Sequence, residues 1–174
     1  MRHSTFRFFA MVALAMACAF MLVACGQGVQ GGGTVRASTS GIACMLVVDS
    51  SSADYPVTVS VVNKSTHAIK LYKVFLPSDG LSLVDMFIVR RDGVKLQYRG
   101  AMAKLPGKPS DDDFASLAPG GRISATIPLS HNYDVGEPGK YIAKYSITHP
   151  QPGGGTLEVV SNEVSFTVQQ KPSK

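Results

Sequence analysis

The feature that most constrains this chain is a two-residue alternation of apolar and polar side chains that begins near Gly41. Residues 56–62 (PVTVSVV) alternate and are rich in β-branched side chains, and residues 68–75 (AIKLYKVF) alternate again. A period of two places every second side chain on one face of an extended strand, whereas a helix needs a period of about 3.6. The folded part of the chain is therefore predicted to consist of strands.

Turn signals divide the alternating runs. Residues 86–91 (MFIVRR) lead into Asp92-Gly93 and then 94–98 (VKLQY), and because such a dipeptide accepts the positive φ of a tight turn, these residues predict a hairpin. Further strands are predicted at residues 122–129, 140–147 and 163–168, and one short helical turn at 111–117. About seven to nine short strands at this spacing predict an all-β fold, an immunoglobulin-like antiparallel β-sandwich.

Composition narrows the class of protein. The 174 residues suit one domain, and 45% hydrophobic with 17% charged residues excludes an intrinsically disordered chain. Three cysteines exclude a small disulfide-stapled protein and a zinc site of four thiolates.

The N-terminal residues are typical of a targeting signal. Residues 1–24 combine basic residues at the start with an apolar run, and Leu22-Val23-Ala24-Cys25 resembles the bacterial lipobox. A lipid would then be attached to the Cys25 thiol, with palmitate among its acyl chains, and the peptide cut before it. The alternative is an uncleaved membrane anchor in which Cys25 occurs by chance.

A lipid anchor implies a bacterial cell envelope. We expect a signal peptide at 1–24, a Gly/Ser-rich tether at 25–40 and a β-sandwich at 41–174. Gly26 stands where an inner-membrane retention signal has Asp, so we expect the outer membrane (periplasmic face or surface) or the cell membrane. This location and the absence of stacking aromatic motifs argue against nucleic acid as a partner.

An ordered series of motifs resembles a known family. The series is FIVRRDG (87–93), YRG (98–100), DF (113–114), LAPG (117–120), LSHNYD (129–134) and GKY (139–141). It resembles the β-rich region that precedes the catalytic domain in secreted deuterolysin-type, peptidyl-Lys metalloendopeptidases, over residues 55–168. The resemblance implies a link to a secreted metallopeptidase.

The zinc motif of that family, His-Glu-x-x-His, is missing from this sequence. His67, His131 and His149 are isolated and none is followed by Glu. No family catalytic residue can therefore be carried over, and we expect neither an enzyme nor a bound cofactor or metal.

Three other groups of residues have competing interpretations. Asp111, Asp112 and Asp113 offer oxygens to a Ca²⁺ ion, or they cap a short helical turn. Cys44 lies in an apolar run and is expected to be a buried strand thiol, while a copper site or a Cys–His pair would need ligands from elsewhere. Tyr141 follows Pro138-Gly139-Lys140 and is typical of a structural tyrosine corner.

The function that we expect is a non-catalytic protein-binding module that inhibits a secreted metallopeptidase or assists its folding. The candidate contact is the loop 99–116, with Arg99, Lys104, Lys108, Asp111, Asp112 and Asp113. Arg91, Lys95 and Arg99 are either a shared basic face for acidic partners or ordinary solvated residues. The alternative function is a structural or adhesive envelope lipoprotein that binds another surface protein or a polysaccharide.

Overall fold

The computed structural model describes residues 41–105 and 107–169, so the predicted signal peptide, Cys25 and the tether lie outside the described residues. The strands are β1 (Ile42–Val48), β2 (Pro56–Asn63), β3 (Ile69–Tyr72), β4 (Phe87–Arg91), β5 (Val94–Lys95), β6 (Phe114–Leu117), β7 (Arg122–Pro128), β8 (Gly139–Pro150) and β9 (Thr156–Val168). Three single 3-10 turns are η1 (Lys73–Phe75), η2 (Asp111–Asp113) and η3 (Leu129–His131). Within the described part of the chain, no helix has the length and apolar character needed to cross a membrane.

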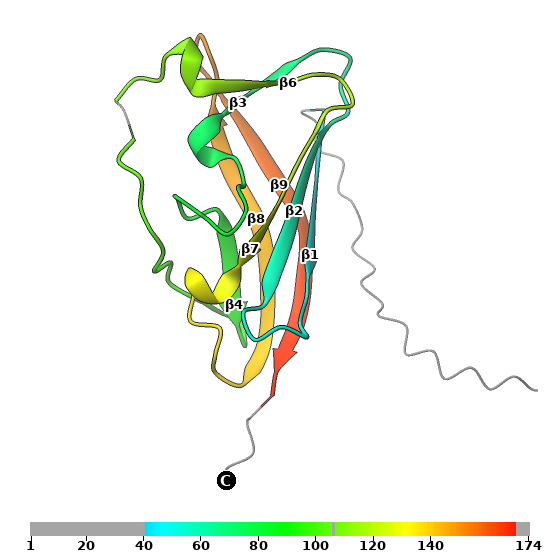
Figure 1. The fold of residues 1–174 in the computed structure, drawn as a ribbon, viewed down its shortest axis with the longest axis vertical. Coiled ribbons are helices and arrows are strands. Elements are labelled where there is room, and N and C mark those ends of the chain that lie inside the picture. The colour runs from blue at the N-terminus through cyan, green and yellow to red at the C-terminus, as the bar shows by residue number, and fades with distance from the viewer. Residues whose placement is uncertain (1–40, 106, 170–174) are drawn as a thin grey trace, which may run out of the picture. The chain divides into compact units, whose positions relative to one another are not determined.

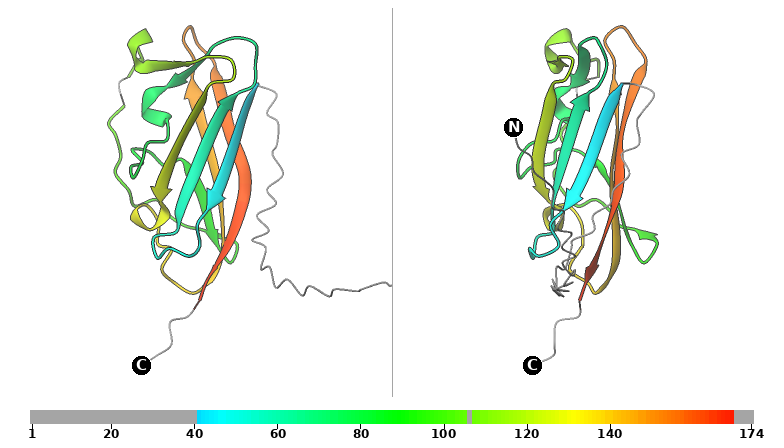
Figure 2. Two further views of the ribbon diagram at one scale, coloured as in Figure 1. Left: turned by 45° about the vertical axis from the view of Figure 1, so that its right-hand side comes forward. Right: turned by 90° about the vertical axis from the view of Figure 1, so that its right-hand side faces the viewer.

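The strands form antiparallel sheets, as predicted. One sheet has the order β1-β2-β7, a second has the order β5-β4-β8-β9, and β3 pairs with β6 in a short ribbon. The two larger sheets form two layers (Figures 1 and 2), with β1 beside β9 on one side and β7 and β5 on the other. The all-β prediction is therefore confirmed.

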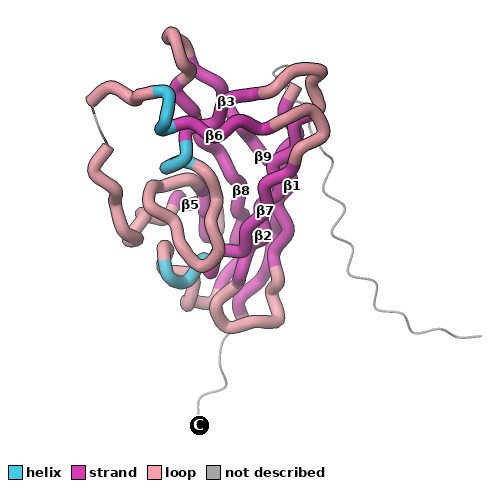
Figure 3. Tube along the Cα trace, turned by 45° about the horizontal axis from the view of Figure 1, so that its top comes forward, coloured by secondary structure: helices cyan, strands magenta, loops and turns pink. Residues whose placement is uncertain are grey.

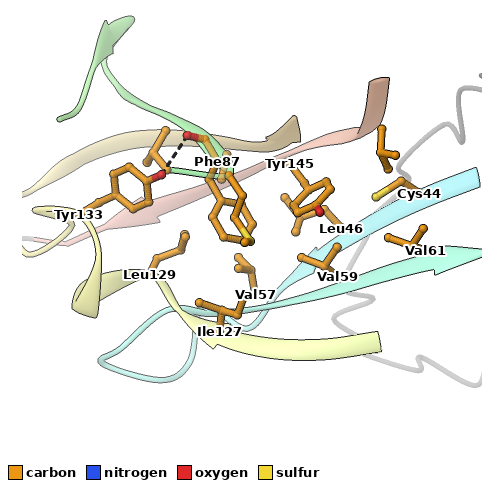
Figure 4. Packing of buried hydrophobic residues seen from close by; sticks show 14 of the residues in the cluster. Cys44, Leu46, Val57, Val59, Val61, Phe87, Ile127, Leu129, Tyr133 and Tyr145 are labelled. Atoms are coloured by element: carbon orange, nitrogen blue, oxygen red, sulfur yellow. Dashed lines mark hydrogen bonds between the residues drawn. The ribbon is translucent and has the colours of Figure 1, made fainter. Parts of the chain in front are cut away.

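The core lies between the two layers. Leu46, Val57, Val59 and Ile127 point inward from the first sheet toward the second, whose Tyr145 also lies between the layers (Figure 4). All five side chains are at most 1% exposed. Burial of one such aliphatic side chain contributes about 1.5–3 kcal/mol, so this alternation of buried and exposed positions supplies the main driving force for the fold.

A bulge in β9 joins the two layers along one side. Lys144 pairs with Glu163 but Ser146 pairs with Val160, so β9 carries one extra residue at this point. The buried amide of Asn162 there accepts the N–H of Leu46 at 2.8 Å and donates to its carbonyl at 3.0 Å. The Asn162 side chain therefore bonds β1 as a neighbouring strand would.

Several element boundaries differ from the prediction. Of the alternating run 68–75, only Ile69–Tyr72 is a strand, and Lys73–Phe75 form the turn η1. Only residues 111–113 form a helical turn, because Phe114 and the residues after it pair with β3 as β6, and the Phe114 ring packs against Tyr72 with a 5.5 Å centroid distance. The return strand of the hairpin is shorter than 94–98 and consists of Val94–Lys95. Strand β9 begins at Thr156 and not at Glu163.

Candidate partner-binding site

The loop between β5 and β6 holds the six residues predicted to contact a partner. It passes from the end of the layers near η3 to the opposite end near η2 (Figures 1 and 3). Arg99 lies in its first part and Asp111–Asp113 form η2 in its last part, while Lys104 and Lys108 are exposed between them. The structure therefore does not gather these residues into one site.

The first part of the loop is held firmly against the domain. The Tyr98 hydroxyl lies 2.9 Å from the Ser82 carbonyl and 2.7 Å from that of Ala101. The Ala103 N–H donates to the carbonyl of Leu83 at 2.7 Å. A Cβ at Gly100 would collide with the Tyr98 hydroxyl and with the Asn132 side chain, so this position requires glycine.

Arg99 itself is fixed through its backbone more than through its side chain. Its N–H donates to the Asn132 carbonyl at 2.8 Å. Its guanidinium forms a 3.5 Å ion pair with Asp134, but the two side chains are 68% and 53% exposed. Such a pair is strongly screened by water, so the guanidinium stays open to a partner.

The acidic residues at the other end form a cap. The Asp113 carboxylate accepts the Ser110 N–H at 2.7 Å and the Ser110 hydroxyl at 2.8 Å. These two bonds, the backbone one first, lower the pKa of Asp113. Lys73 donates through Nζ to the Asp112 carbonyl at 2.5 Å. No group of three or more His, Cys, Asp or Glu side chains suited to a metal occurs in the described residues.

An open groove of about 660 Å³ lies beside Arg99, and sequence reasoning did not predict it. Its lining combines apolar and charged side chains: Asp85, Lys95, Leu96, Gln97, Tyr98, Arg99, Gly100 and Met102. Met102 is 70% exposed and offers apolar surface at the groove. The sequence feature that could have indicated the groove is the basic Asp-Gly hairpin, which brings Lys95 and Arg99 near each other on the surface.

The wall of the groove is supported by Tyr133. Its hydroxyl lies 2.5 Å from an Asp85 carboxylate oxygen and 2.9 Å from the Phe87 carbonyl (Figure 4 shows the second bond). Burial first, and then the Asp85 carboxylate, raise the pKa of Tyr133 above its ordinary value. The Tyr133 hydroxyl therefore remains a neutral donor that orients Asp85.

Of the remaining candidate residues, Cys44, Tyr141 and His149 lie in the core. Cys44 is 2% exposed, and burial raises the pKa of its thiol to about 12, so the reactive thiolate is suppressed. The buried Tyr141 donates its hydroxyl to the Glu137 carbonyl at 2.7 Å. His149 is buried and accepts the Tyr72 N–H through Nδ1 at 3.1 Å, whereas His67 and His131 are exposed.

Comparison with known proteins gives one informative similarity. No protein-family model matches the chain. The chain is 31% identical over 101 residues to a protein described as an extracellular protease, from Aeromonas hydrophila. The match covers 58% of this chain but only 28% of the length of that protein. The chain is therefore similar, over part of its length, to part of a protein described as an extracellular protease.

Proposed function

We propose that this chain is a non-catalytic, immunoglobulin-like binding module, held in the bacterial cell envelope by a lipid on Cys25. Its partner is a secreted metallopeptidase, which it inhibits or helps to fold. The observation that carries the proposal is the similarity to an extracellular protease: the two sequences are 31% identical over a stretch that covers 28% of the length of that protease. A β-rich region that is similar to part of a protease, and not to the whole of it, is suited to bind a protease as a partner.

The arrangement of the strands supports a binding module. In immunoglobulin-like sandwiches one sheet places the first, second and fifth strands together, and the other holds the third, sixth and seventh. With the β3-β6 ribbon and β5 set aside, β1, β2 and β7 correspond to the first, second and fifth of these strands, and β4, β8 and β9 to the third, sixth and seventh. The fourth strand has no counterpart in the two larger sheets. Such sandwiches serve many functions, so the fold agrees with binding without specifying the partner.

The state of the nucleophilic side chains supports a non-catalytic role. The Cys44 thiol is buried with a raised pKa, which removes the thiolate that a Cys nucleophile requires. Burial lowers the pKa of His149 to about 4, and its Nδ1 is occupied by the Tyr72 N–H. These two groups are held as parts of the core.

A binding and activity assay tests the proposal. The full lipidated chain is mixed with the purified secreted metallopeptidase of the same bacterium, and complex formation, peptide hydrolysis and refolding of the denatured peptidase are measured. We expect a stable complex together with slower hydrolysis or a higher refolding yield. The absence of all three effects would contradict the proposal, and capture of envelope proteins or glycan instead would favour a structural or adhesive lipoprotein.

Two sets of variants add controls. The pair Lys104→Glu and Lys108→Glu tests the predicted loop, with Lys64→Glu and Lys140→Glu as the matched control because these lysines are also exposed. Cys25→Ser tests the anchor. We expect it to abolish incorporation of labelled palmitate and release the chain from membranes, while binding of the peptidase is unchanged.

A further inference from the structure

The edges of the two larger sheets differ in how they are covered. Strands β1 and β9 lie side by side, and Asn162 bonds both backbone groups of Leu46. The free edge of β7 is capped at Thr126, whose N–H donates to the Asp79 carboxylate at 2.8 Å and whose carbonyl accepts the Gly80 N–H at 2.9 Å. At the far edge of the second sheet, β5 and the residues that follow it form an edge that borders the open groove.

The backbone of this edge has groups free to pair. Val94 is paired with Arg91 across the two-residue turn, and the Leu96 N–H donates to the Val89 carbonyl at 2.8 Å. In an antiparallel hairpin the residues between such pairs direct their N–H and C=O outward. Lys95 and Gln97 therefore present outward backbone groups, and no acceptor for the Gln97 N–H occurs within residues 41–105 and 107–169.

The groove lies directly along this edge. Lys95, Leu96 and Gln97 line it together with Met102 from the following loop. An extended peptide that pairs with an edge strand needs a recess for alternate side chains, because every second side chain points to the same face. A strand edge with free backbone groups beside an open groove meets both requirements.

The charged side chains around this edge determine which peptide side chains it favours. Lys95 pairs across the hairpin with Arg90, and Arg91 and Arg99 lie nearby in the chain. The one anion of the groove lining, Asp85, is engaged by the Tyr133 hydroxyl. Arg99 faces Asp134 in an exposed pair that leaves the guanidinium accessible. The edge therefore favours carboxylate side chains on its occupant.

We propose that the β5 edge at Lys95–Gln97 binds an extended acidic peptide segment as an added strand. The segment pairs with the outward backbone groups of Lys95 and Gln97, places an apolar side chain in the groove against Leu96 and Met102, and directs carboxylates to Lys95 and Arg99. The inference deepens the proposed function, on which it rests for the source of this segment: a surface strand or loop of the secreted peptidase.

A defined peptide tests the site without the peptidase. The probe is a short, fluorescently labelled, end-capped peptide of alternating valine and glutamate, titrated into the full chain. Its matched controls are the valine–lysine peptide and the same valine–glutamate peptide with alternate amides N-methylated. We expect binding of the first probe alone, with slower hydrogen exchange at the Lys95 and Gln97 amides. N-methylation removes backbone donors and is expected to weaken binding about tenfold or more.

Two variants of the chain test the same site. Gln97→Pro removes one outward N–H and Lys95→Glu reverses one charge, and we expect each to weaken binding about tenfold, with Lys64→Glu as the unchanged control. The N-methylated peptide needs no change in the protein, so it remains decisive if Gln97→Pro fails to fold. No binding of the probe, equal binding of the N-methylated or lysine peptide, or self-association that Lys95→Glu abolishes would overturn the proposal.

Measuring how the peptidase binds to the chain distinguishes a failure of this inference from a failure of the proposed function. If Lys95→Glu and Gln97→Pro bind the peptidase as tightly as the unmodified chain, the edge site is wrong and the proposed function stands. If the acidic peptide binds at the edge but the peptidase does not bind the chain, the proposed source of the segment is wrong and the edge site stands.

Discussion

The two sides of the layered β structure are closed in different ways. On the β1–β9 side, the buried amide of Asn162 satisfies both backbone groups of Leu46 and bonds β9 to β1. On the β5–β7 side, loops are held by scattered contacts such as the Ala103 N–H to the Leu83 carbonyl, and an open groove remains. The first side stabilises the fold, and the second has the features of a binding surface.

The largest effect is expected from a substitution that disrupts the β1–β9 side. Asn162→Leu removes both bonds to Leu46 and leaves its buried N–H and C=O unpaired, which is expected to cost about 2–5 kcal/mol of unfolding free energy. Urea denaturation of the full chain measures the loss. Glu163→Gln, an exposed neighbour on β9, is the control, and a loss below about 1 kcal/mol would mean that this side does not depend on the amide.

The second prediction concerns the effect of low pH on the hydrogen bond between the Tyr72 N–H and His149, which lies on neither of these two sides. Burial lowers the pKa of His149 from 6.5 to about 4, so the unfolded chain takes up this proton at higher pH than the folded chain. His149 therefore reduces stability as the pH falls from 6.5 to about 4, by up to about 3 kcal/mol. Denaturation across this range, compared between the unmodified chain, His149→Gln and the exposed control His67→Gln, should show a flatter pH profile for His149→Gln alone.

A third test loosens the β5–β7 side alone. Gly100→Ala places a methyl group against the Tyr98 hydroxyl and Asn132, and this overpacking is expected to cost about 1–3 kcal/mol. Hydrogen exchange should accelerate at the Arg99 and Ala103 amides and remain unchanged at Leu46. Gly107→Ala is the matched control, because a Cβ there meets no atom within 4 Å. Equal acceleration on both sides would show that the two sides do not open independently.

The smallest expected effect concerns the exposed ion pair. Arg99→Ala breaks the contact with Asp134, which is expected to change the unfolding free energy by less than about 0.5 kcal/mol because both side chains are well hydrated. Urea denaturation at low and high salt measures this change. A loss of unfolding free energy above about 1 kcal/mol would show that the guanidinium stabilises the loop and is not free to contact a partner.

The contrast between the two sides also separates what the sequence predicted from what it did not. Strands such as β2 and β8 were predicted because burial of one face imposes a period of two, and Asp92-Gly93 indicated the hairpin. The first half of β9 was missed because its bulge puts two buried residues in succession, Ser161 and Asn162, and this breaks the period. Strand β6 was missed because it is short and directly follows an acidic triplet.

The candidate site was predicted less well than the strands. Exposure and charge correctly indicated that Arg99, Lys104 and Lys108 lie on the surface, but chain proximity gave no sign that the loop would extend between opposite ends of the layers. The groove depends on Asp85 and Met102, which tertiary packing brings next to Lys95 and Leu96 of the hairpin. No local pattern encodes such a meeting of distant segments.

The Asn162 contact has a mechanical consequence. Strands β1 and β9 run side by side in the same direction, so β1 begins at one end of the layers and β9 finishes at the other (Figure 2). A pulling force that enters at Ile42 and leaves at Val168 therefore acts along both strands and in opposite senses. The two bonds between Asn162 and Leu46 are then loaded in shear, so they resist extension together and do not open one after the other.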